Sequence, residues 1–344
     1  MASNSAVAAK VKAMYGKCLT GEDFDNLLSN RTTGGICSYL KSQTSYSDVL
    51  ADVQENDIHR GILEMKIMNK LESEYNRIYK FVDERQQVIL DYWFMRREVN
   101  YLKHNIRNLF NKESKLSHMP DPEEFSDFFR NHTSIDTELC RNAESLEDFI
   151  AAVRNTIYEP FLKRTLAVNS DYFSIAMGLD ALYYDTYWKE TKKLSGREQS
   201  ALQKLLGSEI DMLNIIWIYR GKKYFKFPDE MIYTYLLPPT YHLTEGAIKS
   251  MVGAKSVEEM VSAASSTKYK RMFRKLEDGF LIDENYRRDL YKTAKSVFRT
   301  SSDTIAGLVA YLDLKEIEIL NIVRAIEGIR YGLNSEAIRK HIRI

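Results

Sequence analysis

The stretch that decides the fold runs from Ile58 to Leu109 and reads IHRGILEMKIMNKLESEYNRIYKFVDERQQVILDYWFMRREVNYLKHNIRNL. In its first half, apolar residues recur in steps of three and four, at Ile58, Ile62, Met65, Met68, Leu71, Tyr75, Ile78 and Val82. The second half continues in the same way, at Val88, Tyr92, Met95, Val99, Leu102, Ile106 and Leu109. Such spacing places the apolar side chains of each half on one helix face. We therefore expect two long helices, packed as an antiparallel hairpin that buries both stripes.

Proline positions outside this stretch favour helices throughout the chain. The 344 residues include only 6 prolines, and most of them fall in two clusters, at positions 120 and 122 and at positions 228, 238 and 239. These helix-breaking residues divide the chain near its thirds. Alternation of apolar and polar residues, which is typical of strands, is not sustained anywhere. The sequence therefore predicts an all-α fold.

A helix signature occurs three times at similar spacing. It reads EVNYLK from Glu98, EIDMLN from Glu209 and EIEILN from Glu316, so the glutamates lie 111 and 107 residues apart. A repeat of this length predicts three related helical units, at residues 1–113, 114–227 and 228–344.

A second pattern accompanies two of the three copies. Leu19-Thr20 is followed after 25 residues by a Thr-x-Tyr triplet, and Leu243-Thr244 is followed after 24 residues by another. Thr20 and Thr244 are typical helix N-caps, because a short hydroxyl can accept a hydrogen bond from a first-turn amide. The middle unit lacks a matching Leu-Thr pair, so we expect it to be the least regular.

Charge and cysteine content restrict the partners and the location. The chain has 49 Lys and Arg against 48 Asp and Glu, and a net charge of +1 offers no global attraction to nucleic acid or anionic lipid. The 3 cysteines form no Cys-x-x-Cys pair, which fits a reducing cytoplasm. We find neither a secretory signal nor an apolar run of the ~18–20 residues that would cross a bilayer. We expect an intracellular protein with no transmembrane segment.

Motifs that would support catalysis are missing from the sequence. No histidine stands in a His-x-x-x-His or Glu-x-x-His pair, which would put two metal ligands on one helix face. Neither a Gly-x-x-x-x-Gly-Lys-Ser/Thr loop nor a Gly-x-Ser-x-Gly elbow occurs. His59 is better explained as a capping or surface residue than as a ligand. The sequence predicts no catalytic residue, no metal site and no cofactor.

Two basic clusters allow two interpretations. One consists of Lys268, Lys270, Arg271, Arg274 and Lys275, and the other, after the second signature helix, of Arg220, Lys222, Lys223 and Lys226. Each can be an ordinary solvated helix face or a surface for an acidic protein partner. Nucleic acid is not expected to be the partner, because the total charge is near neutral and no nucleic-acid motif is present.

Six segments together resemble one known family over essentially the whole chain. They are AKVKAMYGKCLT at 9–20, YLKSQTSY at 39–46, DIHRGILE at 57–64, EIDMLNIIWIYRGKKY at 209–224, YLLPPTYHLT at 235–244 and YLDLKEIEILNIVRAIEGIRYGL at 311–333. Their order and spacing are similar to those of the C subunits of A-type and bacterial V-type rotary ATPases, which are the counterparts of the d subunit in the eukaryotic vacuolar enzyme.

This resemblance implies an all-helical, pseudo-threefold, funnel-shaped body that is not catalytic itself. It further implies a place on the cytoplasmic face of the membrane, where the protein joins the central-stalk subunits to the proteolipid ring. Such a connector couples ATP hydrolysis or synthesis to proton or sodium transport. An α-solenoid adaptor for other protein partners is the alternative, but its repeats would be ~20–50 residues long. The third interpretation, after the connector and the adaptor, is an enzyme.

The segments that follow the second and third signature helices are the expected partner-binding sites. If the three units surround one axis, equivalent helix ends meet on one rim. The residues that we expect to contact the stalk are Arg220, Lys222, Lys223, Tyr224, Arg330 and Tyr331. Arg220 and Arg330 could instead only cap their helices, because a cation is stabilised near a helix C-terminus.

Overall fold

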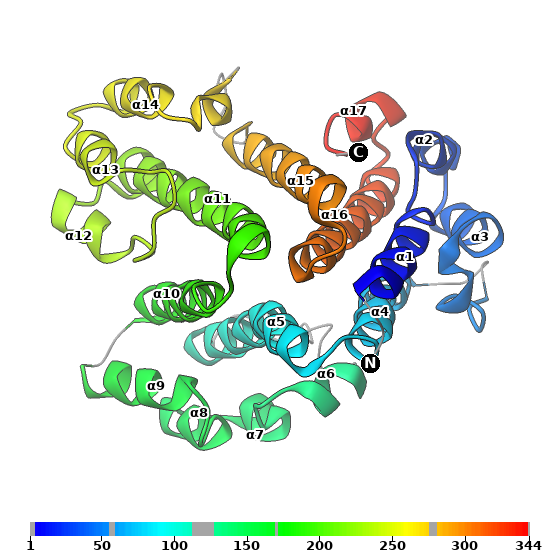
Figure 1. Cartoon of the computed structure of the whole chain (residues 1–344), viewed down its shortest axis with the longest axis horizontal. Coiled ribbons are helices and arrows are strands. Elements are labelled where there is room, and N and C mark those ends of the chain that lie inside the picture. The colour runs from blue at the N-terminus through cyan, green and yellow to red at the C-terminus, as the bar shows by residue number, and fades with distance from the viewer. Residues whose placement is uncertain (1–3, 55–58, 112–126, 169–170, 275–280, 343–344) are drawn as a thin grey trace. The chain divides into compact units, whose positions relative to one another are not determined.

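The computed structural model describes residues 4–54, 59–111, 127–168, 171–274 and 281–342. Within these ranges every regular element is helical and no strand occurs, so the predicted all-α class is confirmed (Figure 1). The longer helices are α4 (Arg60–Tyr79), α5 (Glu84–Phe110), α10 (Tyr172–Thr191), α11 (Gly196–Arg220), α15 (Leu281–Ser301) and α16 (Ile305–Arg330). The shorter ones are α1 (Asn4–Tyr15), α2 (Gly21–Ser29), α3 (Thr33–Gln43), α6 (Asp127–His132), α7 (Thr137–Asn142), α8 (Leu146–Ala152), α9 (Tyr158–Ala167), α12 (Asp229–Thr234), α13 (Glu245–Val252), α14 (Val257–Ser265) and α17 (Ser335–Arg339). Single turns form at η1 (Ser45–Asp48), η3 (Gly221–Phe225) and η4 (Lys270–Phe273).

The order of short and long helices recurs along the chain. The short helices α2 and α3 precede the long α4 and α5, α7 and α8 precede α10 and α11, and α13 and α14 precede α15 and α16. The first predicted boundary, between residues 113 and 114, lies outside the described residues.

Two compact units emerge from the contacts. Unit 1 comprises residues Met1–Gln87, Ser195–Leu205 and Met272–Ile344, and unit 2 comprises Val88–Leu194 and Leu206–Arg271. Each unit is assembled from separate parts of the chain, and unit 1 contains both ends.

In unit 1 the helix α16 is the central element. Its residues Ile305–Leu312 are buried on every side, and it packs against α15, α4 and α1. At Gly307 a Cβ atom would lie 2.4 Å from the carbonyl oxygen of Ser301, so only glycine allows the close turn between α15 and α16. The long helix α4 packs against α16, which follows more than two hundred residues later. Of its predicted apolar stripe, Leu71, Tyr75 and Ile78 are buried, whereas Ile62 is 49% exposed.

In unit 2 the second half of α11 is buried in the same way. Ile210, Ile215 and Ile218 are fully buried, as the apolar character of this segment on nearly every side predicts. The pairs α7 with α8, α9 with α10 and α13 with α14 pack against each other.

Helix caps follow the sequence closely. The Thr20 side chain accepts a hydrogen bond from the N–H of Asp23, and the Thr244 side chain accepts one from Ala247, which confirms both predicted N-caps. His59 caps α4 by accepting a hydrogen bond from Gly61 at 3.2 Å, so the capping interpretation of this residue is correct.

Candidate functional site

A buried carboxylate on α16 joins the two ends of the chain within unit 1. Glu318, 6% exposed, accepts hydrogen bonds from the N–H of Leu19 at 2.7 Å and from the hydroxyl of Tyr46 at 2.8 Å. The ammonium group of Lys315, itself 1% exposed, donates to the same carboxylate at 2.7 Å. The carboxylate thereby holds the residue before α2 and the turn after α3.

A second carboxylate does the same within unit 2. Glu98 on α5 accepts hydrogen bonds from the N–H of Ser134 at 2.6 Å, the hydroxyl of Thr133 at 2.7 Å and the hydroxyl of Tyr158 at 2.7 Å. It therefore holds the segment before α7 and the first residue of α9.

The third carboxylate, Asp211 on α11, is fully buried. It accepts hydrogen bonds from three successive N–H groups, those of Tyr241 at 2.9 Å, His242 at 2.6 Å and Leu243 at 2.9 Å. The hydroxyl of Tyr269 donates to it at 2.6 Å, and this bond and, above all, burial raise the pKa of that tyrosine. Asp211 therefore holds the segment before α13 and the turn after α14.

These three sites, which we call the carboxylate clasps, share one plan. In each, the tyrosine is the last residue of a Thr-x-Tyr triplet whose threonine hydroxyl accepts from the tyrosine N–H, at 3.2, 3.2 and 3.1 Å for Thr44, Thr156 and Thr267. The clasps follow a cyclic order along the chain. Helix α5 binds the segment that contains Tyr158, α11 binds the later segment that contains Tyr269, and α16 binds the early segment that contains Tyr46.

The clasps revise the alignment of the signature helix. The sequence pairs Glu98 with Glu209 and Glu316, but the contacts pair Glu98 with Asp211 and Glu318. In the alignment that the contacts give, the first copy of the signature is shifted by two residues relative to the other two copies. The triplet Thr156-Ile157-Tyr158 was also missed from the sequence, although its spacing from the other two triplets could have revealed it.

A wider set of buried charges surrounds the Glu318 clasp. Lys70, 1% exposed, contacts Asp48 at 2.8 Å and Glu74 at 3.4 Å, and Tyr311 donates to Glu74 at 2.9 Å. Burial raises the pKa of Tyr311, and the charge of Glu74 raises it further. Burial lowers the pKa of Lys315, but the attraction of Glu318 outweighs that effect, so the net shift is upward. Both shifts keep Tyr311 neutral and Lys315 charged at neutral pH, so these groups act as structural ties.

We expect Cys18 and Cys140 to react slowly with thiol reagents while the chain is folded. Burial raises the pKa of both thiols to about 12, so the reactive thiolate is rare at neutral pH. At pH 8 the labelling rate should fall on the order of a thousandfold below that of an unfolded cysteine, and it should rise about tenfold per pH unit. Mass spectrometry of native and urea-unfolded chain labelled with iodoacetamide measures each rate. Fast native labelling of Cys140 would contradict the burial.

The predicted partner-binding residues of unit 2 lie at the end of α11 and in η3. Lys222 is only 12% exposed and donates to the carbonyl of Ala254 at 2.8 Å, so it is largely engaged by its own chain. Lys223 donates to the hydroxyl of Tyr219 at 2.7 Å, and the guanidinium of Arg220 lies 5.7 Å from the Trp217 ring. Tyr224 is 54% exposed. The accessible part of this predicted site is therefore more aromatic than the sequence suggests.

In unit 1, the predicted pair Arg330 and Tyr331 ends α16. The guanidinium of Arg330 lies 5.5 Å from the ring of Tyr331, which is 68% exposed. Of the other basic cluster, Lys275 lies outside the described residues, whereas Lys268, Lys270, Arg271 and Arg274 are exposed.

Within the described residues, no three His, Cys, Asp or Glu side chains are grouped so that they could hold a metal ion. None of the helices described is both long and apolar enough to cross a lipid bilayer.

Comparisons with known proteins identify the family. The profile described as ATP synthase (C/AC39) subunit matches residues 7–341. The chain is 23% identical over 343 residues to the C subunit of the A-type ATP synthase of Thermococcus kodakarensis, covering 97% of this chain and 88% of that protein. It is 22% identical over 342 residues to the C subunit of the Pyrococcus horikoshii enzyme, with 97% and 88% covered. The C subunit of Methanocaldococcus jannaschii is 19% identical over 353 residues, with 98% and 86% covered. Because the profile spans nearly the whole sequence, the chain belongs to the family of ATP synthase (C/AC39) subunits and is a non-catalytic subunit of a rotary ATPase complex.

Proposed function

We propose that this chain is the connector between the central stalk and the membrane proteolipid ring of a V/A-type rotary ATPase. It sits at the cytoplasmic face of the membrane and is held there by protein contacts. Through it, ATP hydrolysis or synthesis is coupled to proton or sodium transport. The observation that carries this proposal is the match to C subunits of A-type ATP synthases over 97% of the chain.

The carboxylate clasps support a mechanical role. A part that passes torque must resist shear, and tightly packed helices do so because protein interiors are nearly as dense as organic crystals. Each clasp adds charge-assisted hydrogen bonds between segments far apart in sequence, such as Leu19 and Glu318. The cyclic order of the clasps also supports three related units, at residues 1–113, 114–227 and 228–344, as the plan of the connector.

We expect loss of this subunit to uncouple the complex. Soluble-sector ATPase activity should persist because the chain supplies no catalytic group, whereas ion transport should stop because the stalk no longer reaches the ring. Vesicles reconstituted with and without the chain are assayed for both activities, and re-addition of the purified chain is the control. Pumping at the normal rate without the chain would overturn the connector role.

We propose in addition that Arg220, Lys222, Lys223 and Tyr224, with Arg330 and Tyr331, contact the stalk. Reversing Arg220, Lys222 and Lys223 together to Glu should weaken stalk binding severalfold. Three reversals are combined because one exposed ion pair contributes only ~0–1 kcal/mol. Stalk affinity and melting temperature are measured on the same variant. Unchanged affinity and salt dependence in a stable variant would remove these residues from the interface.

A further inference from the structure

The helix α15 carries a stripe of basic side chains on one face. This α15 stripe consists of Arg288, Lys292, Lys295 and Arg299. Steps of four, three and four keep the cations on one side of the helix, over about 16 Å at ~1.5 Å per residue. The opposite side buries Ala294, Val297 and Phe298, and α15 packs against α16.

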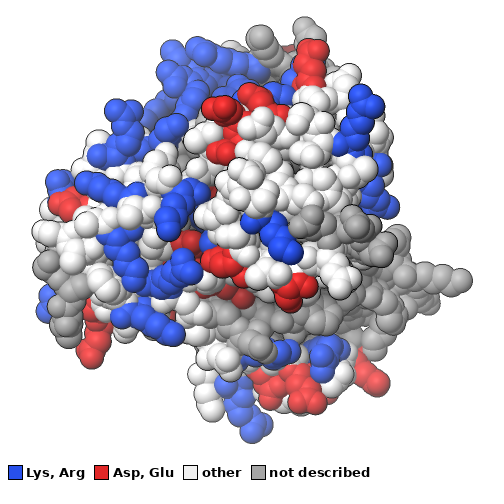
Figure 2. All heavy atoms as spheres, turned by 90° about the vertical axis from the view of Figure 1, so that its right-hand side faces the viewer, with Lys and Arg blue, Asp and Glu red and all other residues white. Residues whose placement is uncertain are grey.

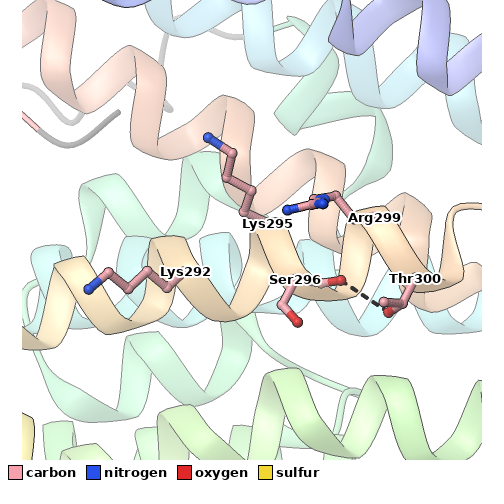
Figure 3. A pocket seen from close by; sticks show the side chains of 5 residues that line it. All are labelled: Lys292, Lys295, Ser296, Arg299 and Thr300. Atoms are coloured by element: carbon pink, nitrogen blue, oxygen red, sulfur yellow. Dashed lines mark hydrogen bonds between the residues drawn. The ribbon is translucent and has the colours of Figure 1, made fainter.

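The C-terminal part of the stripe lines an open groove. Its volume is about 360 Å³, and its lining is Lys292, Lys295, Ser296, Arg299 and Thr300 (Figure 3). The Thr300 hydroxyl donates to the carbonyl of Ser296 at 3.0 Å, drawn as a dashed line in Figure 3. Lys204 donates to the Ser296 hydroxyl at 3.0 Å and so brings another cation beside the groove.

Acidic neighbours do not neutralise this groove. Residues 290–302 contain no Asp or Glu; Asp289 precedes them, and Asp303, which follows them, pairs with Arg197. Lys295 donates to the Tyr291 hydroxyl at 3.0 Å. Among the described residues, neither Lys292 nor Arg299 has a hydrogen bond or an ion pair with an acidic side chain.

The N-terminal helix adds to the positive charge. Residues 4–21 contain no acidic residue, and Lys12 and Lys17 are exposed. The rings of Tyr15 and Phe298 lie 4.4 Å apart, which seats the end of α1 against α15. On the face seen in Figure 2, Lys and Arg side chains are most numerous on the left, and fewer Asp and Glu side chains lie among them. The neutral total charge therefore hides an uneven distribution.

We propose that the α15 stripe docks an acidic helical segment of the central stalk. This inference rests on the proposed function, because the connector role makes the stalk the partner. The spacing of the cations is that of one helix facing another, so glutamates at i, i+4, i+7 and i+11 would meet them in register. A single phosphate would need cations that converge on one point, whereas these extend over three turns. A lipid surface would favour apolar side chains beside the cations, but Ser296 and Thr300 are polar.

The test compares two charge-reversed chains. The first carries K292E, K295E and R299E in the stripe. The matched control carries K189E, K192E and K193E at the end of α10, where all three lysines are exposed, so both variants change the net charge equally. Binding to the purified stalk is measured for each chain as a function of salt. A synthetic helical peptide with glutamates at i, i+4, i+7 and i+11 is measured beside its glutamine counterpart.

We expect the stripe variant to bind the stalk at least about tenfold more weakly, and the control to bind within about twofold of the original chain. The original chain should prefer the glutamate peptide, and high salt should remove the preference. If the stripe variant fails to fold, K292Q, K295Q and R299Q replace the reversals. Equal stalk affinity in the stripe variant and the control, or no preference of the original chain for the glutamate peptide, would overturn the inference. Neither result would affect the connector role, which depends on the vesicle assay.

Discussion

Asp211→Ala is expected to destabilise the chain by about 4 kcal/mol, because it leaves several buried donors without an acceptor. The fully buried carboxylate accepts from the N–H groups of Tyr241, His242 and Leu243 and from the Tyr269 hydroxyl. A buried donor without a partner costs ~1–3 kcal/mol, and the separate costs do not simply add.

Urea unfolding, followed by circular dichroism, measures this loss as a shift of the midpoint by about 1 M. Tyr269→Phe removes only one of the four donors and should cost about 2 kcal/mol. Glu209→Gln is the control, because Glu209 lies on the same helix and its bonds to Arg96 at 3.0 Å and Tyr184 at 3.0 Å can be kept in part by the glutamine oxygen. A midpoint for Asp211→Ala equal to that of the control would show that the clasp contributes little.

Glu318→Ala is expected to cost a similar amount, about 3–5 kcal/mol, for a different reason. It removes the closest partner of Lys315, which is 1% exposed and would keep a buried, poorly compensated charge. It also removes the acceptor of Leu19 and Tyr46.

The double variant Lys315→Met with Glu318→Ala separates the two effects. Without the buried cation, the chain should regain part of the lost stability, since replacing a buried ion pair by apolar groups is often close to neutral. Tyr46→Phe gives the contribution of one hydrogen bond for comparison. A double variant less stable than Glu318→Ala alone would show that the buried charge is not the main cost.

Local patterns predicted the helices well. The three-four spacing from Ile58 to Leu109 corresponds to α4 and α5, and the caps at Thr20 and Thr244 form as their side-chain chemistry requires. The apolar segment around Ile215 forms a buried helix, in which the side chain of Asn214 bonds to the backbone of Leu237. These features depend on neighbours within a few turns, which a sequence shows directly.

Features that depend on distant partners were harder to predict. The packing of α4 against α16 was not predicted, because an apolar stripe shows that a helix face is buried but not which element covers it. The middle clasp was missed because Ile135-Asp136 replaces Leu-Thr before α7, although Asp136 caps the helix equally well. The α15 stripe was missed because its cations are periodic and not consecutive, so it does not form a run.

Unit 1 has a consequence for synthesis on the ribosome. Its Leu19 amide and Tyr46 hydroxyl require Glu318, which is translated 299 and 272 residues later. Residues 88–194 and 206–271, by contrast, contain both partners of the Glu98 and Asp211 clasps. We therefore expect folding during translation to begin in the middle of the chain. Leu19 and Tyr46 leave the exit tunnel well before Glu318, so we expect them to be among the last residues to find their native partners and to stay accessible to chaperones until α16 has emerged.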